Sequence, residues 1–222
     1  MTPRQLSFDL PVREALGRDD FFVSPANAEA VAMIEGWRGW PSRKLLLVGP
    51  PGSGKTHLAH VWATLADAQI IAAQALVQAD IPTLAASNIA VEDCDAIARD
   101  AEAEETLFHL HNLALAEGQT VLFTATRAPK HWGLSLPDLA SRMQGTLTIT
   151  LREPDDALLA AVLMKLMTDR QLAPSPETVP YLTRRIDRSF EAARDVVEQL
   201  DALALATGRP INRALAAKVL DK

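Results

Sequence analysis

The strongest constraint on this chain is a phosphate-loop motif, Gly49-Pro50-Pro51-Gly52-Ser53-Gly54-Lys55-Thr56, which fits the pattern of glycine, four residues, glycine, lysine and Ser/Thr. Glycines let such a loop turn tightly and bring its backbone N–H groups against phosphates. Lys55 is expected to reach the β- and γ-phosphates, and Thr56 to offer its hydroxyl to Mg²⁺. Residues 44–48 predict a buried parallel strand and residues 56–66 a helix whose N-terminus favours anions. The alternative is an ordinary turn, but a chance match rarely has both flanks.

Composition excludes several classes of protein. With 222 residues, of which 48% are hydrophobic, the chain can form one large domain or a domain with a smaller companion. No apolar run is long enough to span a bilayer, and residues 1–10 lack the features of a secretion signal. We therefore expect a cytoplasmic protein without a membrane partner. A single cysteine, Cys94, excludes an internal disulfide and is expected to be a packed thiol.

The net charge of −6 argues against strong direct binding to DNA, which requires clustered Lys and Arg. Arg184, Arg185 and Arg188 crowd one short stretch, and we interpret them as a solvated helix face. His109 and His111 lie two apart on a predicted helix, so they face different directions and are not expected to share a metal.

The predicted elements alternate between strands and helices up to residue 153 and are helical from there on. Further strands are predicted at 69–72, 87–91, 120–125 and 146–151, with helices at 25–37, 100–117 and 137–143. Four helices follow at 155–170, 175–186, 189–206 and 210–220. The predicted fold class is α/β: a nucleotide-binding core with a parallel sheet, followed by a small helical lid domain.

An acidic pair, Glu92-Asp93, ends the third predicted strand. Downstream of a phosphate loop, this is the position at which such folds hold Mg²⁺ and orient the attacking water. Without the loop, the pair would be interpreted as a solvated turn. Thr126 and Arg127 end the next strand and are expected to border the same crevice.

The N-terminal segment Gln5-Leu6-Ser7-Phe8-Asp9-Leu10 alternates apolar and polar residues ahead of a proline, which predicts an extended conformation. It is either a short edge strand of the domain or a peptide that a partner's groove captures.

The motifs together resemble the AAA+ domain of the bacterial replication initiator DnaA, in order and spacing, from about residue 21 to the C-terminus. The matching stretches are residues 22–27, Gly54-Lys55-Thr56-His57-Leu58, Glu92-Asp93, residues 124–129 and Leu139-Ala140-Ser141-Arg142. A DnaA-like core without the initiator's other domains is similar to the Hda-like regulatory AAA+ proteins, which inactivate DnaA after replication starts.

This resemblance implies three parts: residues 1–20 as a clamp-binding peptide and linker, 21–153 as an AAA+ P-loop domain and 154–222 as a lid domain. The nucleotide, ADP or ATP with Mg²⁺, would contact Phe22, Val23, Asn27, Gly49, Pro51, Gly52, Ser53, Gly54, Lys55, Thr56, His57 and the lid residue Arg194. Mg²⁺ would be held by Thr56 and, through water, by Glu92, while Asp93 would act in catalysis. Arg188 competes with Arg194 for the lid position.

The resemblance also implies two protein partners. Gln5, Leu6, Phe8 and Leu10 resemble the peptide that docks on the β sliding clamp of DNA polymerase III, with Gln5 at the pocket rim and the others as apolar anchors. Arg142 would be an arginine finger that acts in trans on the ATP of DnaA, an effect that can raise a rate by ~10³ to 10⁵. The alternative for Arg142 is a salt bridge on a short helix. The protein would then be associated with the nucleoid through the clamp.

Two positions depart from the initiator's pattern. Glu92 stands where DnaA-type sequences usually have Asp, and Thr126 stands where the initiator has an acidic sensor residue. Placement of water and metal depends on side-chain length and charge, so weak or absent intrinsic ATPase activity is expected, with tight binding of nucleotide. Self-association into a homo-oligomer stays open.

Two rival functions remain at this point. A self-sufficient ATPase resembling DnaC-type helicase loaders would act on single-stranded DNA, but it needs a basic strand-binding surface and an intact catalytic pair. A small-molecule kinase would need further basic residues over an acceptor phosphate, a role that residues 184–188 could imitate.

Overall fold

The computed structural model describes residue 23 and residues 25–221. The helices are α1 (Ala28–Glu35), α2 (Lys55–Ala66), α3 (Ile81–Ala85), α4 (Ala101–Ala116), α5 (Pro137–Gln144), α6 (Asp156–Asp169), α7 (Thr178–Thr183), α8 (Phe190–Thr207) and α9 (Arg213–Leu220). The strands are β1 (Lys44–Val48), β2 (Gln69–Ala72), β3 (Ile89–Glu92), β4 (Val121–Ala125) and β5 (Thr148–Thr150). Among the described residues, no helix is long and apolar enough to cross a membrane.

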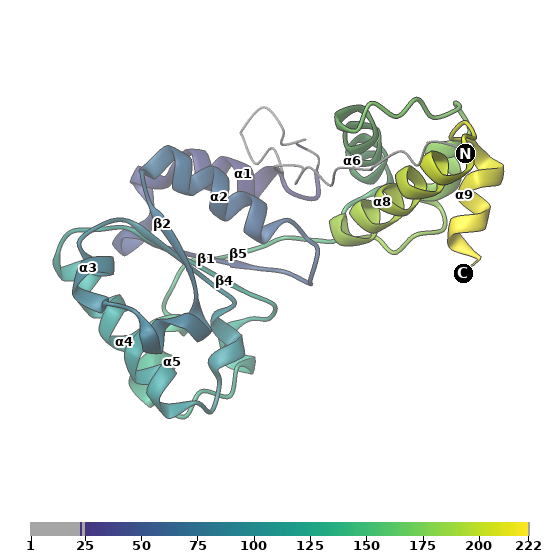
Figure 1. The fold of residues 1–222 in the computed structure, drawn as a ribbon. Helices are drawn as coiled ribbons and strands as arrows, with labels where there is room; N and C mark the ends of the chain where they lie inside the picture. Colours follow the sequence, from purple (N-terminus) through teal and green to yellow (C-terminus); the bar gives the residue numbers. More distant parts are fainter. Residues whose placement is uncertain (1–22, 24, 222) are drawn as a thin grey trace.

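The five strands form one parallel sheet in the order β2-β3-β4-β1-β5, which confirms the predicted α/β class. Successive side chains of a strand point to opposite faces of the sheet, so each buried strand contributes to two cores. Leu46 and Phe123 pack on the face covered by α3, α4 and α5, while Leu45 and Leu122 pack on the face covered by α1 and α2. The helices flank the sheet in two layers (Figure 1).

The tryptophans serve packing in this sheet layer. Trp40 and Trp62 stack with ring centroids 5.3 Å apart, and Trp37 meets Trp62 edge-on. Trp132 is buried, and its Nε1 donates to the carbonyl oxygen of Arg127. Cys94 is buried as predicted, and burial raises the pKa of its thiol.

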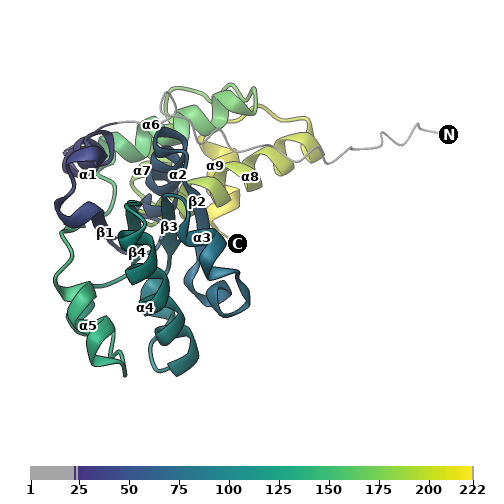
Figure 2. The same ribbon diagram turned by 90° about the vertical axis from the view of Figure 1, so that its left-hand side faces the viewer.

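The four helices after β5 enclose a core of their own, beside the sheet layer rather than on either of its faces (Figures 1 and 2). Its centre is formed by Leu159, Leu163, Leu182, Val197 and Leu200, all of which are fully buried. We call this unit the lid. Because its core is separate, the lid can pack as a unit against the edge of the sheet layer.

Several predicted boundaries are corrected by the structure. The first helix begins at Ala28 with Asn27 as its N-cap, not at Pro25. The helix predicted at 175–186 contains only the six residues of α7 within a longer turn region, and the last strand is limited to 148–150. The five-residue helix α3 is too short to produce a periodic pattern and was not predicted.

Candidate nucleotide-binding site

The phosphate loop joins the carboxyl end of β1 to the first turn of α2, as its flanks predict. Gly52 and Gly54 have φ angles of +71° and +94°, a conformation that residues with a Cβ rarely adopt. At Gly49 a Cβ would lie 2.6 Å from Ser53 Oγ and 2.8 Å from the Leu151 carbonyl oxygen. The backbone conformation and the close packing of the loop therefore require glycine at these three positions.

Lys55 lies buried at the start of α2, and its Nζ donates to the carbonyl oxygens of Gly49 (2.7 Å) and Pro50 (2.9 Å). Burial lowers the pKa of this ammonium, while the nearby carboxylates of Asp93, Asp95 and Glu92 oppose the shift. A cation on a flexible stem at this position can exchange loop carbonyls for phosphate oxygens.

Two buried polar atoms near the loop lack a hydrogen-bond partner among the described residues, namely Ser53 Oγ and Glu92 Oε1. An unpaired buried polar atom is costly in a folded protein, and such atoms usually mark a bound group or water. Thr56 is exposed at the same helix start. Hydroxyl and carboxylate oxygens are ligands that Mg²⁺ accepts, so Thr56 and Glu92 have the chemistry to hold such an ion.

The carboxyl ends of β3 and β4 bring together a cluster that the sequence did not predict. Asp95, buried in a 3₁₀ turn after β3, accepts hydrogen bonds from the backbone N–H (3.1 Å) and the hydroxyl of Thr126. Its Oδ2 also lies 3.6 Å from Nε of Arg127. Thr126 thus stands beside a carboxylate from the neighbouring strand end, so an acidic group is present where the sequence indicated only a hydroxyl.

The two residues of the acidic pair differ in their exposure to solvent. Glu92 is half-buried at the end of β3, whereas Asp93 is exposed and has a φ of +55°. The backbone N–H of Asp93 is held by the hydroxyl of Thr124 at 3.0 Å. This local turn places Asp93 outside the sheet, toward solvent.

The lid closes the other side of the loop. The backbone N–H of Phe190 donates to the Gly52 carbonyl oxygen at 2.9 Å, and the Phe190 ring lies against Gly54. An open cleft of about 380 Å³ lies between the loop and the lid, lined by Pro51, Glu153, Ile186, Asp187, Arg188 and Ser189. The N-terminus of α8, whose dipole favours anions, therefore points at the phosphate loop.

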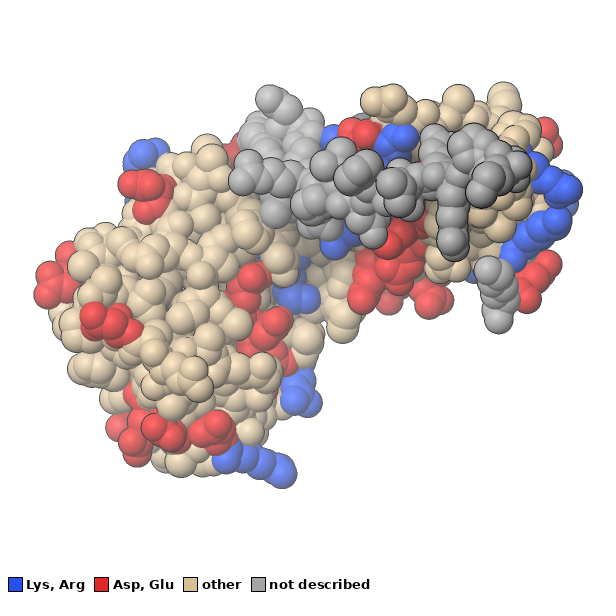
Figure 3. Space-filling model, in the orientation of Figure 1, with Lys and Arg blue, Asp and Glu red and all other residues tan. Residues whose placement is uncertain are grey.

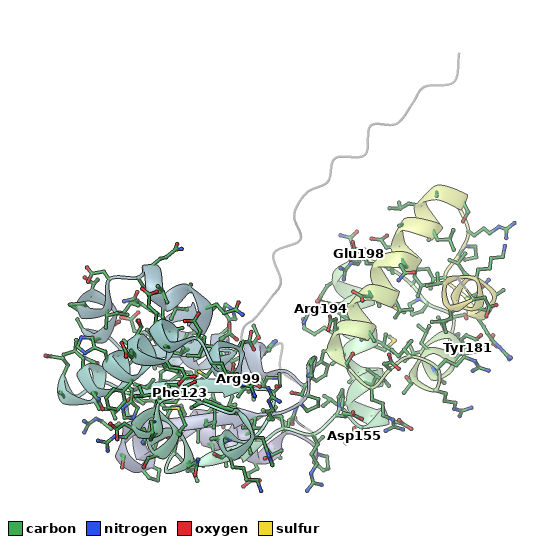
Figure 4. All side chains as sticks on the ribbon, turned by 90° about the horizontal axis from the view of Figure 1, so that it is seen from below. Arg99, Phe123, Asp155, Tyr181, Arg194 and Glu198 are labelled. Atoms are coloured by element: carbon green, nitrogen blue, oxygen red, sulfur yellow. The ribbon has the colours of Figure 1, made fainter. Side chains whose placement is uncertain are left out.

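The two arginines proposed for the lid position differ in surroundings. Arg188 pairs with Asp156 at 2.7 Å. Arg194 lies further along α8, on the side that faces the sheet layer, whereas Tyr181 lies on the opposite side of the lid (Figure 4).

Of the remaining predicted nucleotide contacts, the structure describes Val23, Asn27 and His57 but not Phe22. Asn27 is buried at the N-terminus of α1, and Val23 is about half exposed. His57 is half-buried in the first turn of α2. Phe22 and the clamp-peptide residues Gln5, Leu6, Phe8 and Leu10 lie outside the described residues.

Arg142 lies near the amino end of β1, whereas the phosphate loop follows the carboxyl end of that strand. Its backbone carbonyl accepts a hydrogen bond from Nζ of Lys44, the first residue of β1, whereas the loop follows the last residue of that strand. A five-residue strand spans roughly 15 Å. The Arg142 side chain is exposed, so it faces outward at an edge remote from the chain's own loop.

Comparison with known proteins agrees with this architecture. The chain is 25% identical to the chromosomal replication initiator protein DnaA of Thermomicrobium roseum over 91% of its length. That alignment covers 48% of the initiator, so the chain spans about half the length of the curated relatives it matches. No family model matches the chain.

Solved structures of DnaA share the fold. Domain III of DnaA from Thermotoga maritima superposes with a TM-score of 0.80 at 18% identity, covering 96% of this chain and 98% of that one. A replication initiator DnaA bound to AMPPCP and single-stranded DNA superposes with a TM-score of 0.73 at 17% identity, covering 93% and 69%. The chain is thus similar in sequence to about half of DnaA, and it shares the α/β fold of DnaA domain III.

Proposed function

We propose that this DnaA homologue is a nucleotide-binding AAA+ adaptor that docks on the β sliding clamp and promotes hydrolysis of DnaA-bound ATP. In this role it would negatively regulate the initiation of DNA replication. Its own loop would hold ADP or ATP with Mg²⁺, through Lys55, Thr56 and Glu92. Residues 1–20 would carry the clamp-binding peptide.

One observation carries the proposal more than any other. Arg142 is exposed at the edge of the sheet away from the loop, with Lys44 Nζ on its backbone carbonyl. A guanidinium there is remote from the chain's own γ-phosphate position, yet it is available to a neighbouring molecule. An arginine that is supplied in trans stabilises the charge that develops during phosphoryl transfer.

Weak intrinsic turnover is consistent with the carboxylates at the loop. Asp93, the expected catalytic carboxylate, is exposed in a left-handed turn, and Asp95 is engaged by Thr126 and Arg127. Neither arrangement resembles a water-activating carboxylate that is held rigidly against a phosphate, as efficient hydrolysis requires. Arg194 keeps its proposed role as the lid residue that contacts the chain's own nucleotide.

The test is the rate of ATP hydrolysis by purified DnaA with this protein added, with and without DNA-loaded clamp. Wild type should stimulate hydrolysis only with the clamp, and Arg142→Ala should abolish the stimulation. Arg38→Ala is the matched control, because Arg38 is an exposed arginine that stacks on Trp37 at 4.5 Å, away from α5. Replacing Gln5 and Leu6 by alanine should remove binding to the clamp. Unchanged DnaA hydrolysis in every mixture would refute the adaptor function.

A self-sufficient ATPase resembling a DnaC-type helicase loader is the second candidate, because one homologous structure is that of an initiator bound to single-stranded DNA. The described residues on the face shown in Figure 3 form no continuous basic surface, which disfavours this function. Steady ATP turnover by this chain alone, stimulated by single-stranded DNA, would favour it over the adaptor.

A further inference from the structure

Two buried charged side chains lie at the two ends of α5, the helix that carries Arg142. Glu104 of α4 is fully buried, and Lys44 of β1 is 8% exposed. Among the described residues neither forms an ion pair with an opposite charge. A buried charge is unfavourable unless it is hydrogen-bonded, so the partners of these two groups indicate what they do.

Glu104 holds the start of α5. Its carboxylate accepts hydrogen bonds from the backbone N–H groups of Ser135 (2.8 Å) and Leu136 (2.7 Å), the two residues that lead into the helix. It also accepts from the N–H of Arg99 at 2.7 Å. A carboxylate with three backbone donors is well satisfied without a counter-ion.

Lys44 holds the end of α5. Its Nζ donates to the carbonyl oxygen of Arg142 at 3.2 Å and lies 3.4 Å from Nε2 of His111. The hydroxyl of Thr146 donates to the same carbonyl at 2.8 Å. His111 is buried, and burial lowers its pKa to about 4, so its neutral ring can accept from the ammonium.

The helix between these two anchors is short. At eight residues α5 is below the length at which an isolated helix is stable, and only Leu139 and Met143 of its residues are buried in the core. Its position therefore depends on contacts at its ends. An arginine that acts on another molecule must be held accurately, because a displacement of about 1 Å can reduce a rate by ~10²-fold.

We propose that Glu104 and Lys44 are positioning residues that fix both ends of α5, and thereby hold Arg142 in the orientation it needs to act on a neighbouring nucleotide. This inference rests on the proposed function. It assigns to two residues remote from any nucleotide a part in the stimulated reaction. Neither side chain touches the reacting atoms.

The test compares Lys44→Met and Glu104→Gln with Arg43→Met. Arg43 is the matched control because it adjoins Lys44 and also donates to backbone carbonyls, but to those of Leu115 (2.6 Å) in the last turn of α4 and Gln119 (3.3 Å) in the loop that follows. The first readout is hydrogen–deuterium exchange of the amides of α5. The second is clamp-dependent DnaA hydrolysis as a function of adaptor concentration, measured below the melting temperature of each variant.

We expect faster exchange in α5 for Lys44→Met and Glu104→Gln, but not for Arg43→Met. The hydrolysis rate at saturating adaptor should fall about tenfold, while the adaptor concentration for half-maximal stimulation changes less than twofold. ADP binding by the loop is measured in parallel and should be retained. Retained binding would show that the variants are folded, so the lower saturating rate would not be due to general destabilisation.

Unchanged exchange in α5 would overturn the inference, as would a full saturating rate in a variant whose α5 exchanges faster. If wild type does not stimulate DnaA at all, the proposed function fails. The exchange data then still decide whether these two side chains hold α5.

Discussion

The backbone N–H of Phe190 donates a 2.9 Å hydrogen bond to the carbonyl oxygen of Gly52, which joins the first turn of the lid helix α8 to the phosphate loop. Ser189, the N-cap of α8, lies against the same glycine. The phosphate loop and the lid are therefore in direct contact at Gly52. A substitution that displaces the loop backbone there is expected to displace the start of α8 as well.

Gly52→Ala tests this connection against Gly118→Ala. Both glycines have positive φ angles, +71° and +83°, so both substitutions carry a similar backbone strain of ~1–2 kcal/mol. A Cβ at Gly52 would lie 2.7 Å from Ser189 Cβ, whereas a Cβ at Gly118 would meet open space. Urea denaturation should show an additional loss of ~1–3 kcal/mol for Gly52→Ala only. Equal losses in the two variants would show that the lid does not rest on the loop.

Lys55→Met should abolish stabilisation by nucleotide. Ligand at 100 times its dissociation constant raises the free energy of unfolding by ~2.7 kcal/mol, and we expect ADP with Mg²⁺ to do so for wild type. Nζ of Lys55 lies over the loop carbonyls at 2.7 and 2.9 Å, where phosphates would bind. The measurement is the melting temperature with and without ADP, with Arg38→Ala as a control that keeps the shift. A shift of wild-type size in Lys55→Met would remove this lysine from the site.

Asp95→Asn should destabilise the protein by ~1–3 kcal/mol, because one carboxylate oxygen that accepts from Thr126 becomes a donor in a buried position. Asp93→Asn is the matched control. Asp93 is exposed, and Asn tolerates its left-handed φ, so the loss there should stay below about 0.5 kcal/mol. Chemical denaturation of both variants measures the difference, and similar stabilities would mean that the Asp95 cluster contributes little.

Stability should fall in mildly acidic solution because of His111. Burial lowers its pKa to about 4, and the cations Lys44 and Arg142 act in the same direction, against the opposing hydrogen bond with Asn112. In the unfolded chain a histidine titrates near pH 6.5, so the unfolded state binds more protons between about pH 6.5 and 4. The contribution is complete well above pH 6.5 and is lost as the pH falls, by roughly 2 kcal/mol at pH 5.

Urea denaturation at pH 7 and pH 5 of wild type and His111→Asn measures this contribution. The variant should show a smaller drop in stability between the two pH values, since the other titrating groups are common to both proteins. An identical drop would mean that His111 is protonated in the folded state at pH 5.

Much of the fold was predictable because local and global preferences agree in this sequence. Lys44-Leu45-Leu46-Leu47-Val48 is apolar beyond its first residue and is followed by a glycine-rich loop, a combination that only a buried parallel strand and its phosphate loop explain well. Ser189 caps α8 through its side chain, as Asp155 caps α6, so the starts of these two lid helices lie within one residue of their predicted positions.

The Asp95 cluster could not be predicted in the same way. Asp95 and Thr126 are 31 residues apart, and their contact depends on the left-handed turn at Asp93 and the 3₁₀ turn that follows it. Neither turn contains a glycine that would signal it. The anchors of α5 are equally hidden, because a lysine at the start of a strand and a glutamate in the first turn of a helix have ordinary explanations at the surface.

Because Arg142 and the phosphate loop lie near opposite ends of β1, the molecule has two different ends. If Arg142 acts in trans as proposed, the recipient site lies at the carboxyl ends of the strands and the donor arginine near their amino ends. Two copies or two homologues would then join head to tail rather than about a two-fold axis. A contact of this kind would leave one unsatisfied donor and one unsatisfied recipient at opposite ends of any row. A subunit that donates but hydrolyses poorly itself is suited to the end of such a row, where it acts on its neighbour without requiring a further subunit to act on it.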